Sequence, residues 1–211
     1  MVTKQIKSKA RVQKHGEVFT AEREVKAMCD LVSDETKRID SRFLEPACGD
    51  GNFLAEILNR KLKFVRTKYK KDLIDYEKQS ILAISSLYGV DILIDNVQAC
   101  RERLYKIWDK QYTSIFKDYC IDETRNAVKF ILSKNIVCGN ALTLMCVDEG
   151  GKDTQEPIVF SEWAFITGMN ISRKDYTLDE LINGNNRQLK LDIDGEGKFL
   201  QQYTANYRRL V

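Results

Sequence analysis

Residues 43–54 read Phe-Leu-Glu-Pro-Ala-Cys-Gly-Asp-Gly-Asn-Phe-Leu. This stretch combines a short apolar strand, a turn with two glycines and the start of an amphipathic helix. Gly49 and Gly51 carry no side chains, so the backbone there can take positive φ angles and approach a ligand closely. A ligand is expected over the carboxyl end of the strand, beside Glu45. A dinucleotide site would place a third glycine at position 54, and Leu54 stands there, which argues against NAD.

The segment Glu45–Phe53 resembles the cofactor motif of S-adenosylmethionine-dependent N6-adenine DNA methyltransferases. A second block, Gly16–Thr20 followed by a helical run over 23–32, is similar to the segment that precedes the glycine turn in that family. The resemblance implies that the turn wraps the amino acid end of S-adenosylmethionine. It also implies that Thr20 holds the cofactor carboxylate, although the two prolines that commonly follow are absent at 21–22.

Helix and strand patterns extend this unit in both directions. Residues 20–32 predict an amphipathic helix with its first residue as N-cap, packed against the sheet edge, and residues 52–61 predict a helix after the turn. Residues 86–92 predict a second strand, followed by a helix over 96–108. Two successive strand-helix units favour a parallel sheet.

Asp91 ends the second expected strand, where an acidic side chain can accept both ribose hydroxyls of a nucleoside cofactor. Dinucleotide folds place this residue about 20 positions after the glycine turn, and here the gap is roughly twice that. A charged helical insertion over 59–79 accounts for the difference, and its surface is either solvated or nucleic-acid-binding. The segment Tyr88–Ile92 resembles the family's second cofactor motif; the alternative is an ordinary Asp at a strand end.

Residues 135–142 predict a third strand and resemble the family's third cofactor motif. The family usually has an Asp that contacts the amine of the cofactor's adenine, and Asn140 offers a side-chain carbonyl for the same hydrogen bond. The resemblance as a whole assigns these residues to an S-adenosylmethionine site: Thr20, Glu45, Pro46, Ala47, Cys48, Gly49, Gly51, Phe53, Asp91, Ile92, Asn140 and Ala141.

The resemblance breaks after a fourth expected strand at 157–160, which follows a polar loop over 148–156. At this point the family carries Asp or Asn, then Pro-Pro, then Tyr or Phe, which hold the flipped base and polarise its amine. This chain reads Phe-Ser-Glu-Trp-Ala-Phe over 160–165. The catalytic residues are therefore unknown. Structural roles are expected for residues 161–163, and the alternative is that they supply an acceptor and a stacking face.

About fifty residues follow Phe160, too few for both the rest of a seven-stranded core and a target-recognition domain. They predict a helix that starts with the capping box Thr177–Glu180 and a strand at Leu189–Ile193. The segment Asp192–Gly197 lacks the ligand series of a calcium loop and is expected to be a turn. No metal is expected.

With 211 residues and 43% hydrophobic content, the chain has the size of one domain. We expect a flexible basic arm at 1–14 and a single domain at 15–211. The net charge of +3 permits nucleic-acid binding without indicating it. No apolar run reaches the roughly 20 residues of a membrane span, and the polar start is not a secretory signal, so a cytoplasmic protein without membrane attachment is expected. Six scattered cysteines indicate neither disulfides nor zinc.

These observations predict an α/β fold: a Rossmann-like methyltransferase sandwich with a mostly parallel sheet flanked by helices and an incomplete C-terminal part. The resemblance implies an S-adenosylmethionine-dependent DNA adenine-N6 methyltransferase-like protein of a restriction-modification system, with DNA as a partner directly or through another chain. The alternative is a non-catalytic cofactor-binding subunit or interaction module that associates with a second methyltransferase or specificity subunit. A methyltransferase acting on a small molecule or a protein is a third interpretation, because cofactor motifs do not identify a substrate.

Overall fold

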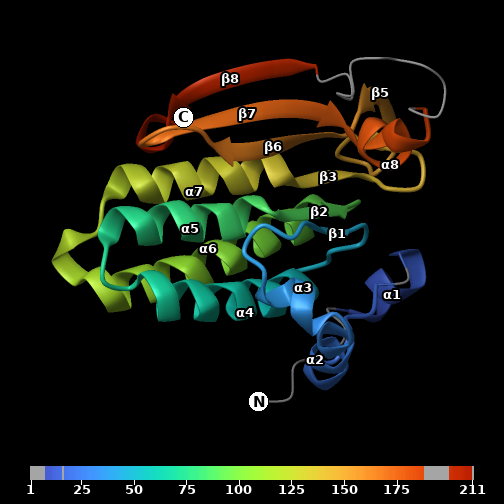
Figure 1. The fold of residues 1–211 in the computed structure, drawn as a ribbon. Helices are drawn as coiled ribbons and strands as arrows, with labels where there is room; N and C mark the ends of the chain where they lie inside the picture. Colours follow the sequence, from blue (N-terminus) through green and yellow to red (C-terminus); the bar gives the residue numbers. More distant parts are fainter. Residues whose placement is uncertain (1–7, 16, 188–199, 211) are drawn as a thin grey trace.

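The structure is a computed structural model that describes residues 8–15, 17–187 and 200–210. It contains a short sheet, a bundle of helices, and a second sheet laid on the bundle (Figure 1). The helices are α1 (Lys9–His15), α2 (Glu22–Leu31), α3 (Ser33–Lys37), α4 (Asn52–Tyr69), α5 (Leu73–Ser85), α6 (Ile94–Phe116), α7 (Asp122–Asn135) and α8 (Leu178–Arg187), with short 3-10 turns η1 (Lys117–Tyr119) and η2 (Tyr207–Arg209). The strands are β1 (Phe43–Glu45), β2 (Leu87–Asp91), β3 (Ile136–Asn140), β4 (Met145–Val147), β5 (Asp153–Pro157), β6 (Val159–Phe165), β7 (Asn170–Thr177) and β8 (Gln201–Asn206).

The first sheet has five strands in the order β1-β2-β3-β4-β5. Its first three strands are parallel, with Glu45 opposite Gly89 and Asp91 opposite Cys138. Strands β4 and β5 then join as antiparallel hairpins. The chain is therefore an α/β protein with a mixed sheet, and the three parallel strands are the first three that the sequence predicted.

Two helices run directly into strands. Helix α5 ends at Ser85 and β2 begins at Leu87, while α7 ends at Asn135 and β3 begins at Ile136. These helices lie in line with the strands that follow them (Figure 1). Helices α4 and α6 cover one face of the parallel strands and then pack against α5 and α7. The four helices therefore form a bundle that continues the line of the sheet.

The other face of the parallel strands is covered by the second sheet and α8. A small core joins them, in which Tyr88 and Val90 of β2 pack with Ile158, Phe160 and Leu178. The second sheet, β6-β7-β8, is antiparallel and also packs on α5 and α7. The expected flanking by α4 and α6 is thus seen on one face, whereas the second face packs mainly on strands.

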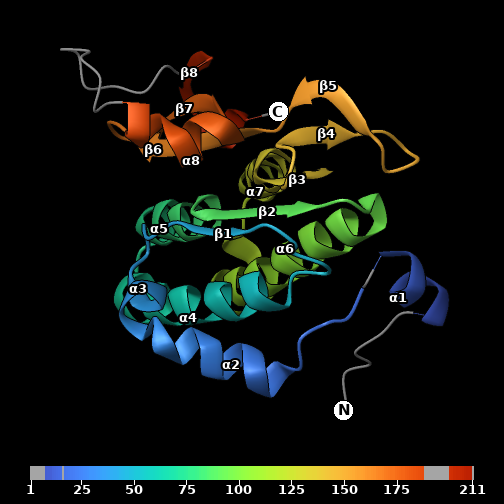
Figure 2. The same cartoon turned by 90° about the vertical axis from the view of Figure 1, so that its right-hand side faces the viewer.

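The helix expected over 20–32 is α2, but its N-cap is Ala21, so the prediction of Thr20 as N-cap is wrong. Its buried residues, Val25 and Cys29, pack against α4 rather than the sheet edge. The reason is the layer order, because α4 lies between α2 and the parallel strands (Figure 2). Met28, also expected on the inner face, is 53% exposed.

The loop expected over 148–156 contains most of β5, and the strand expected at 157–160 is divided between two sheets. The break is at Ile158, whose N–H donates to the carbonyl of Leu144 at 2.9 Å. The Ile158 side chain fills the space beside Gly139, where a Cβ would meet it at 2.5 Å. This packing turns the chain out of the first sheet and into β6.

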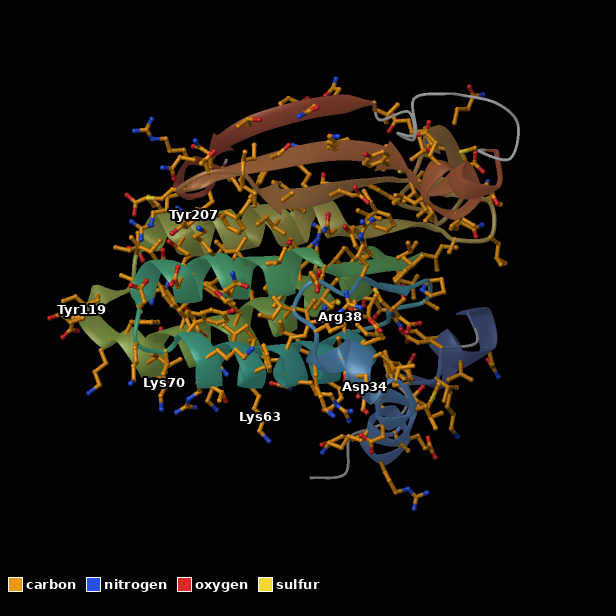
Figure 3. All side chains as sticks on the ribbon, in the orientation of Figure 1. Asp34, Arg38, Lys63, Lys70, Tyr119 and Tyr207 are labelled. Carbon is orange, nitrogen blue, oxygen red and sulfur yellow. The ribbon has the colours of Figure 1, made fainter. Side chains whose placement is uncertain are left out.

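The charged stretch 59–79 forms α4, the following turn and the start of α5. Lys63 and Lys70 point away from the body of the protein (Figure 3) and have no ion pair in the described part of the chain. Lys61 differs, because its side chain is fully buried. The stretch therefore presents a cationic outer face, but one of its lysines belongs to the interior.

The C-terminal region begins as predicted. The Glu180 N–H donates to Thr177 Oγ1 at 3.1 Å, and the Thr177 N–H donates to Glu180 Oε2 at 3.4 Å, which completes the capping box of α8. The strand expected at Leu189–Ile193 and the turn expected at Asp192–Gly197 lie outside the described residues. Residues 9–14 of the expected basic arm lie in α1. Among the described residues, no helix has the length and apolar character needed to cross a bilayer.

Candidate ligand-binding site

The carboxyl ends of β1 and β2 meet at the glycine turn. The Cys48 N–H donates to the carbonyl of Val90 at 2.8 Å, and the Gly49 N–H donates to the Asp91 carboxylate at 2.9 Å. Asp91 lies 42 positions after Gly49 because the hairpin of α4 and α5 separates them in the chain. Parallel pairing of β1 with β2 therefore brings two of the sequence-predicted cofactor motifs into contact.

Gly49 and Gly51 both have left-handed backbones, with φ of +53° and +86°. A Cβ on Gly49 would lie 2.8 Å from a ring carbon of Phe19, and one on Gly51 would lie 2.7 Å from the sulfur of Cys100. Both positions therefore require glycine for their backbone conformation and for space. Since Phe19 belongs to the upstream block, that block and the glycine turn are in contact.

Thr20 lies beside the start of α4. Its backbone carbonyl accepts a hydrogen bond from the Asn52 side chain at 3.3 Å. Helix α4 has Gly51 at its N-cap and no side-chain capping hydrogen bond. The first N–H groups of this 18-residue helix, together with its dipole, favour an anion at this end. This end of α4 therefore suits a ligand carboxylate.

Asp91 is half-buried and held by three donors. Its Oδ2 accepts from Gly49, and its Oδ1 accepts from the Leu93 N–H at 2.9 Å and from Asn96 Nδ2 at 3.2 Å. A carboxylate offers about four acceptor positions, so this arrangement fixes the group and leaves it capacity for a further donor. A ligand hydroxyl is a suitable donor.

Glu45 ends β1 next to the turn and is half-buried. Burial raises the pKa of its carboxyl, and the Ala47 N–H partly opposes this effect. No lysine or arginine among the described residues forms an ion pair with it. A half-buried carboxylate without a cationic partner suits a positively charged ligand group.

Asn140, at the carboxyl end of β3, is bound to its own hairpin. Its Oδ1 accepts from the Leu142 N–H at 3.0 Å, and its Nδ2 donates to Asp153 of β5 at 3.0 Å. Ala141 packs on the small core. The Cys138 thiol of β3 donates to the carbonyl of Ile92 at 3.7 Å. The described contacts therefore place Asn140 at the same sheet edge as Asp91 but do not join it to the glycine turn.

The remaining expected residues support the turn. Pro46 and Ala47 form its first part. Cys48 is buried, and its contact with the Cys100 thiol and its burial raise the pKa of its own thiol. Phe53 packs on the main core. Cys48 and Phe53 thus hold the turn from inside.

Four residues that the sequence did not single out as site residues form a network beside Asp91. Arg11 donates to Glu17 at 2.5 and 2.8 Å and to Asp95 at 2.9 Å. Asn96 Nδ2 donates to Glu17 at 2.8 Å and to Asp91. Glu17 stands within the upstream block, but nothing in the sequence indicates its partners, which lie on α1 and α6.

The segment 161–165, where the family would carry its catalytic motif, lies at the opposite end of the sheet. The backbone N–H of Ser161 and the indole N–H of Trp163 donate to Asn135 Oδ1 at 3.3 and 3.4 Å, and Glu162 pairs with Arg42. Asn135 and Arg42 each come directly before the first residue of a parallel strand. Strand β6 therefore runs back toward the amino ends of the parallel strands, where residues 161–163 contact Asn135 and Arg42.

A scan against protein-family models, a search of curated proteins and a search of solved structures found no match to this chain. In the part of the chain that the structure describes, no group of three or more His, Cys, Asp or Glu side chains is placed to hold a metal ion.

Proposed function

We propose that the site at the carboxyl ends of β1 and β2 binds S-adenosylmethionine, and that the chain is a DNA adenine-N6 methyltransferase-like protein of a restriction-modification system. The observation that carries this proposal is the convergence of three segments that each resemble a cofactor motif. Phe19 and Thr20 lie against the glycine turn, and the Gly49 N–H is bonded to Asp91. Such a turn at the carboxyl end of a parallel strand is where α/β folds bind nucleotide-type ligands.

The charges around the turn match those of S-adenosylmethionine. The start of α4 and Thr20 would hold the carboxylate, and Glu45 would face the ammonium or sulfonium group. Asp91 would accept a ribose hydroxyl. The bound cofactor would supply an electrophilic methyl group. Asn140 would accept from the adenine amine through its Oδ1, which already accepts from the Leu142 N–H and has a second lone pair.

A second candidate function, a cofactor-binding subunit that is catalytic only with another chain, is favoured by the direction of β6. The acceptors that polarise an adenine amine must lie beside the cofactor, and residues 161–165 lie at the other end of the sheet. Strand β1 pairs only with β2 among the described strands. A strand of a partner chain would therefore find an open edge next to Glu45.

Calorimetric titration with S-adenosylmethionine tests the cofactor site. The wild-type chain is expected to bind saturably, Asp91→Ala to bind at least about tenfold more weakly, and Asp118→Ala, an exposed change on η1, to bind as the wild type does. Circular dichroism shows that each variant is folded. A folded wild-type chain that does not bind would remove the cofactor claim.

Transfer of labelled methyl groups to adenine in duplex DNA separates the two candidate functions. Transfer by the isolated chain would establish the enzyme and rule out the subunit. Transfer only after co-expression with a methyltransferase subunit that carries the missing Pro-Pro motif would establish the subunit. Cofactor binding without transfer in either arrangement would leave a binding module.

A further inference from the structure

We propose that Arg11 is a positioning residue for this site: it fixes Glu17 and, through Asn96, orients Asp91 toward the ligand. The inference rests on the proposed function, because it requires Asp91 to contact a bound nucleoside. It adds a helix outside the three motifs, α1, to the cofactor site.

Arg11 connects α1 to the first turn of α6. Its Nε and Nη2 donate to the two oxygens of Glu17 at 2.5 and 2.8 Å, and its Nη1 donates to Asp95 Oδ2 at 2.9 Å. Asp95 lies 84 positions away in the chain. The planar guanidinium contacts both carboxylates at once, which a lysine ammonium cannot reproduce with the same geometry.

Asn96 carries this arrangement to Asp91. Asn96 is 1% exposed, and its Oδ1 accepts from Arg11 Nη2 at 3.3 Å. Its Nδ2 donates to Glu17 at 2.8 Å and to Asp91 at 3.2 Å. The cation therefore sets the orientation of the amide, with the oxygen toward Arg11 and the nitrogen toward two carboxylates.

Loss of the Arg11 guanidinium would disturb this arrangement of hydrogen bonds. The Glu17 side chain is 8% exposed and would lose its bidentate partner. It would then compete with Asp91 for the single amide of Asn96. Glu17 also precedes Phe19 and Thr20, which contact the glycine turn, so Arg11 holds the upstream block and Asp91 through one group.

The affinity for S-adenosylmethionine tests the role of Arg11. We expect Arg11→Met to weaken binding by roughly tenfold and Arg11→Lys to restore only part of the loss. The matched control is Arg125→Met, since Arg125 also bridges two carboxylates, Asp109 and Asp122, at 2.7 Å each. Its side chain is 23% exposed against 26% for Arg11, and it lies on α7. This control is expected to bind as the wild type does.

A double-mutant cycle separates positioning from general loosening. If Arg11 acts through Asp91, then Arg11→Met in an Asp91→Asn background should weaken binding by less than about twofold. Hydrogen exchange without ligand should be faster in Arg11→Met over residues 17–20 and 91–96 and unchanged in α7. Two results would overturn the inference. One is that the losses of affinity from Arg11→Met and Asp91→Asn multiply in the double variant, and the other is that Arg11→Met leaves hydrogen exchange over these segments unchanged.

The two proposals fail in different ways. A wild-type chain that does not bind S-adenosylmethionine refutes the proposed function and the positioning role with it. A wild-type chain that binds, with Arg11→Met binding equally well, refutes only the role of Arg11.

Discussion

Glu77 in α5 and Tyr207 near the end of the chain are joined by a hydrogen bond of 2.5 Å across 130 positions. Glu77 is fully buried. Tyr112 of α6 and Thr124 of α7 donate to its Oε1, while Tyr207 and Arg208 donate to its Oε2. Tyr207 lies over α7 at the end of the bundle distant from the glycine turn (Figure 3). The turn η2 therefore completes the core of the helix bundle.

Removing the cation of this cluster should destabilise the whole fold. Arg208→Met leaves the buried Glu77 carboxylate without its ion pair, which lies at 2.6 Å. We expect a loss of about 3 kcal/mol in the free energy of unfolding, the lower end for a broken buried pair because Arg208 is partly exposed. Urea denaturation measures it. Arg209→Met, at the exposed neighbouring position, should change stability by less than about 0.5 kcal/mol, and equal effects of the two variants would argue against the cluster.

Lys61 makes stability depend on pH near neutrality. Its ammonium donates to the carbonyls of Ile39 and Ser41 and to the hydroxyl of Ser86, and burial lowers its pKa to about 7. The unfolded chain, with an ordinary lysine pKa near 10.4, binds more protons between these two values. Stability should therefore rise with pH from about 7 to 10, at up to about 1.4 kcal/mol per pH unit.

The comparison with Lys61→Met isolates this contribution. The variant leaves the three acceptors without their donor at every pH, so its offset in stability is not diagnostic. The diagnostic quantity is the pH dependence of stability. The free energy of unfolding of the wild type, relative to that of the variant, should increase as pH rises through this window. Parallel curves from pH 6 to 10 would show that Lys61 stays protonated in the folded chain.

Gly49→Ala should lower both stability and cofactor affinity. The change places a methyl group at a left-handed position and 2.8 Å from the Phe19 ring. Gly168 is a matched control, because its φ is +60° and a Cβ there would meet nothing within 4 Å. Gly168→Ala should cost roughly 1 kcal/mol from backbone strain alone, and Gly49→Ala should cost more. Thermal unfolding measures stability and calorimetry measures affinity. Equal losses of stability in Gly49→Ala and Gly168→Ala would show that the Phe19 ring moves aside without an energetic cost.

The outer face of α4 should contribute to DNA binding if DNA is the partner. Lys63, Arg66 and Lys70 are exposed and share one helical face, since they stand at positions i, i+3 and i+7. Replacing all three by Gln should reduce the slope of log affinity against log salt for a duplex by roughly two to three. The control replaces three exposed lysines on α3, on α7 and in the loop before β5: Lys37, Lys129 and Lys152. Equal losses in both triple variants would indicate net charge rather than a surface on α4.

Much of the local structure around the site could be predicted from the sequence. The strand at 43–45, the glycine turn and the helix after it follow one another within a few residues, where backbone preference and hydrophobic period act directly. The strand ending in Asp91 and the third strand at 136–140 were predicted on the same grounds. The capping box at Thr177 was predicted because its two hydrogen bonds join residues three positions apart.

Other expectations failed where packing overrides local pattern. Residues 157–160 have the composition of one strand, but Ile158 packs against Gly139, 19 positions earlier in the sequence, and the chain changes sheets. Lys61 stands in a charged run, yet it is buried and its ammonium contacts Ile39, Ser41 and Ser86, which all lie outside α4. Neither outcome can be found from a window of neighbouring residues.

The sequence alone predicts the strand, the glycine turn at Gly49 and Gly51 and the helix that follows, because glycine's conformational freedom and the strand-turn-helix period are local properties. The tertiary structure alone shows how the glycine turn and its surroundings are held, with Asp91 bonded to Gly49 and Glu17 to Arg11. At the other end of the bundle it joins Glu77 to Tyr207. It also shows that residues 161–165 lie at the far end of the sheet from the cradle. The physical reason is that a hydrogen bond or ion pair between distant segments depends on burial and mutual orientation, which only the folded chain supplies.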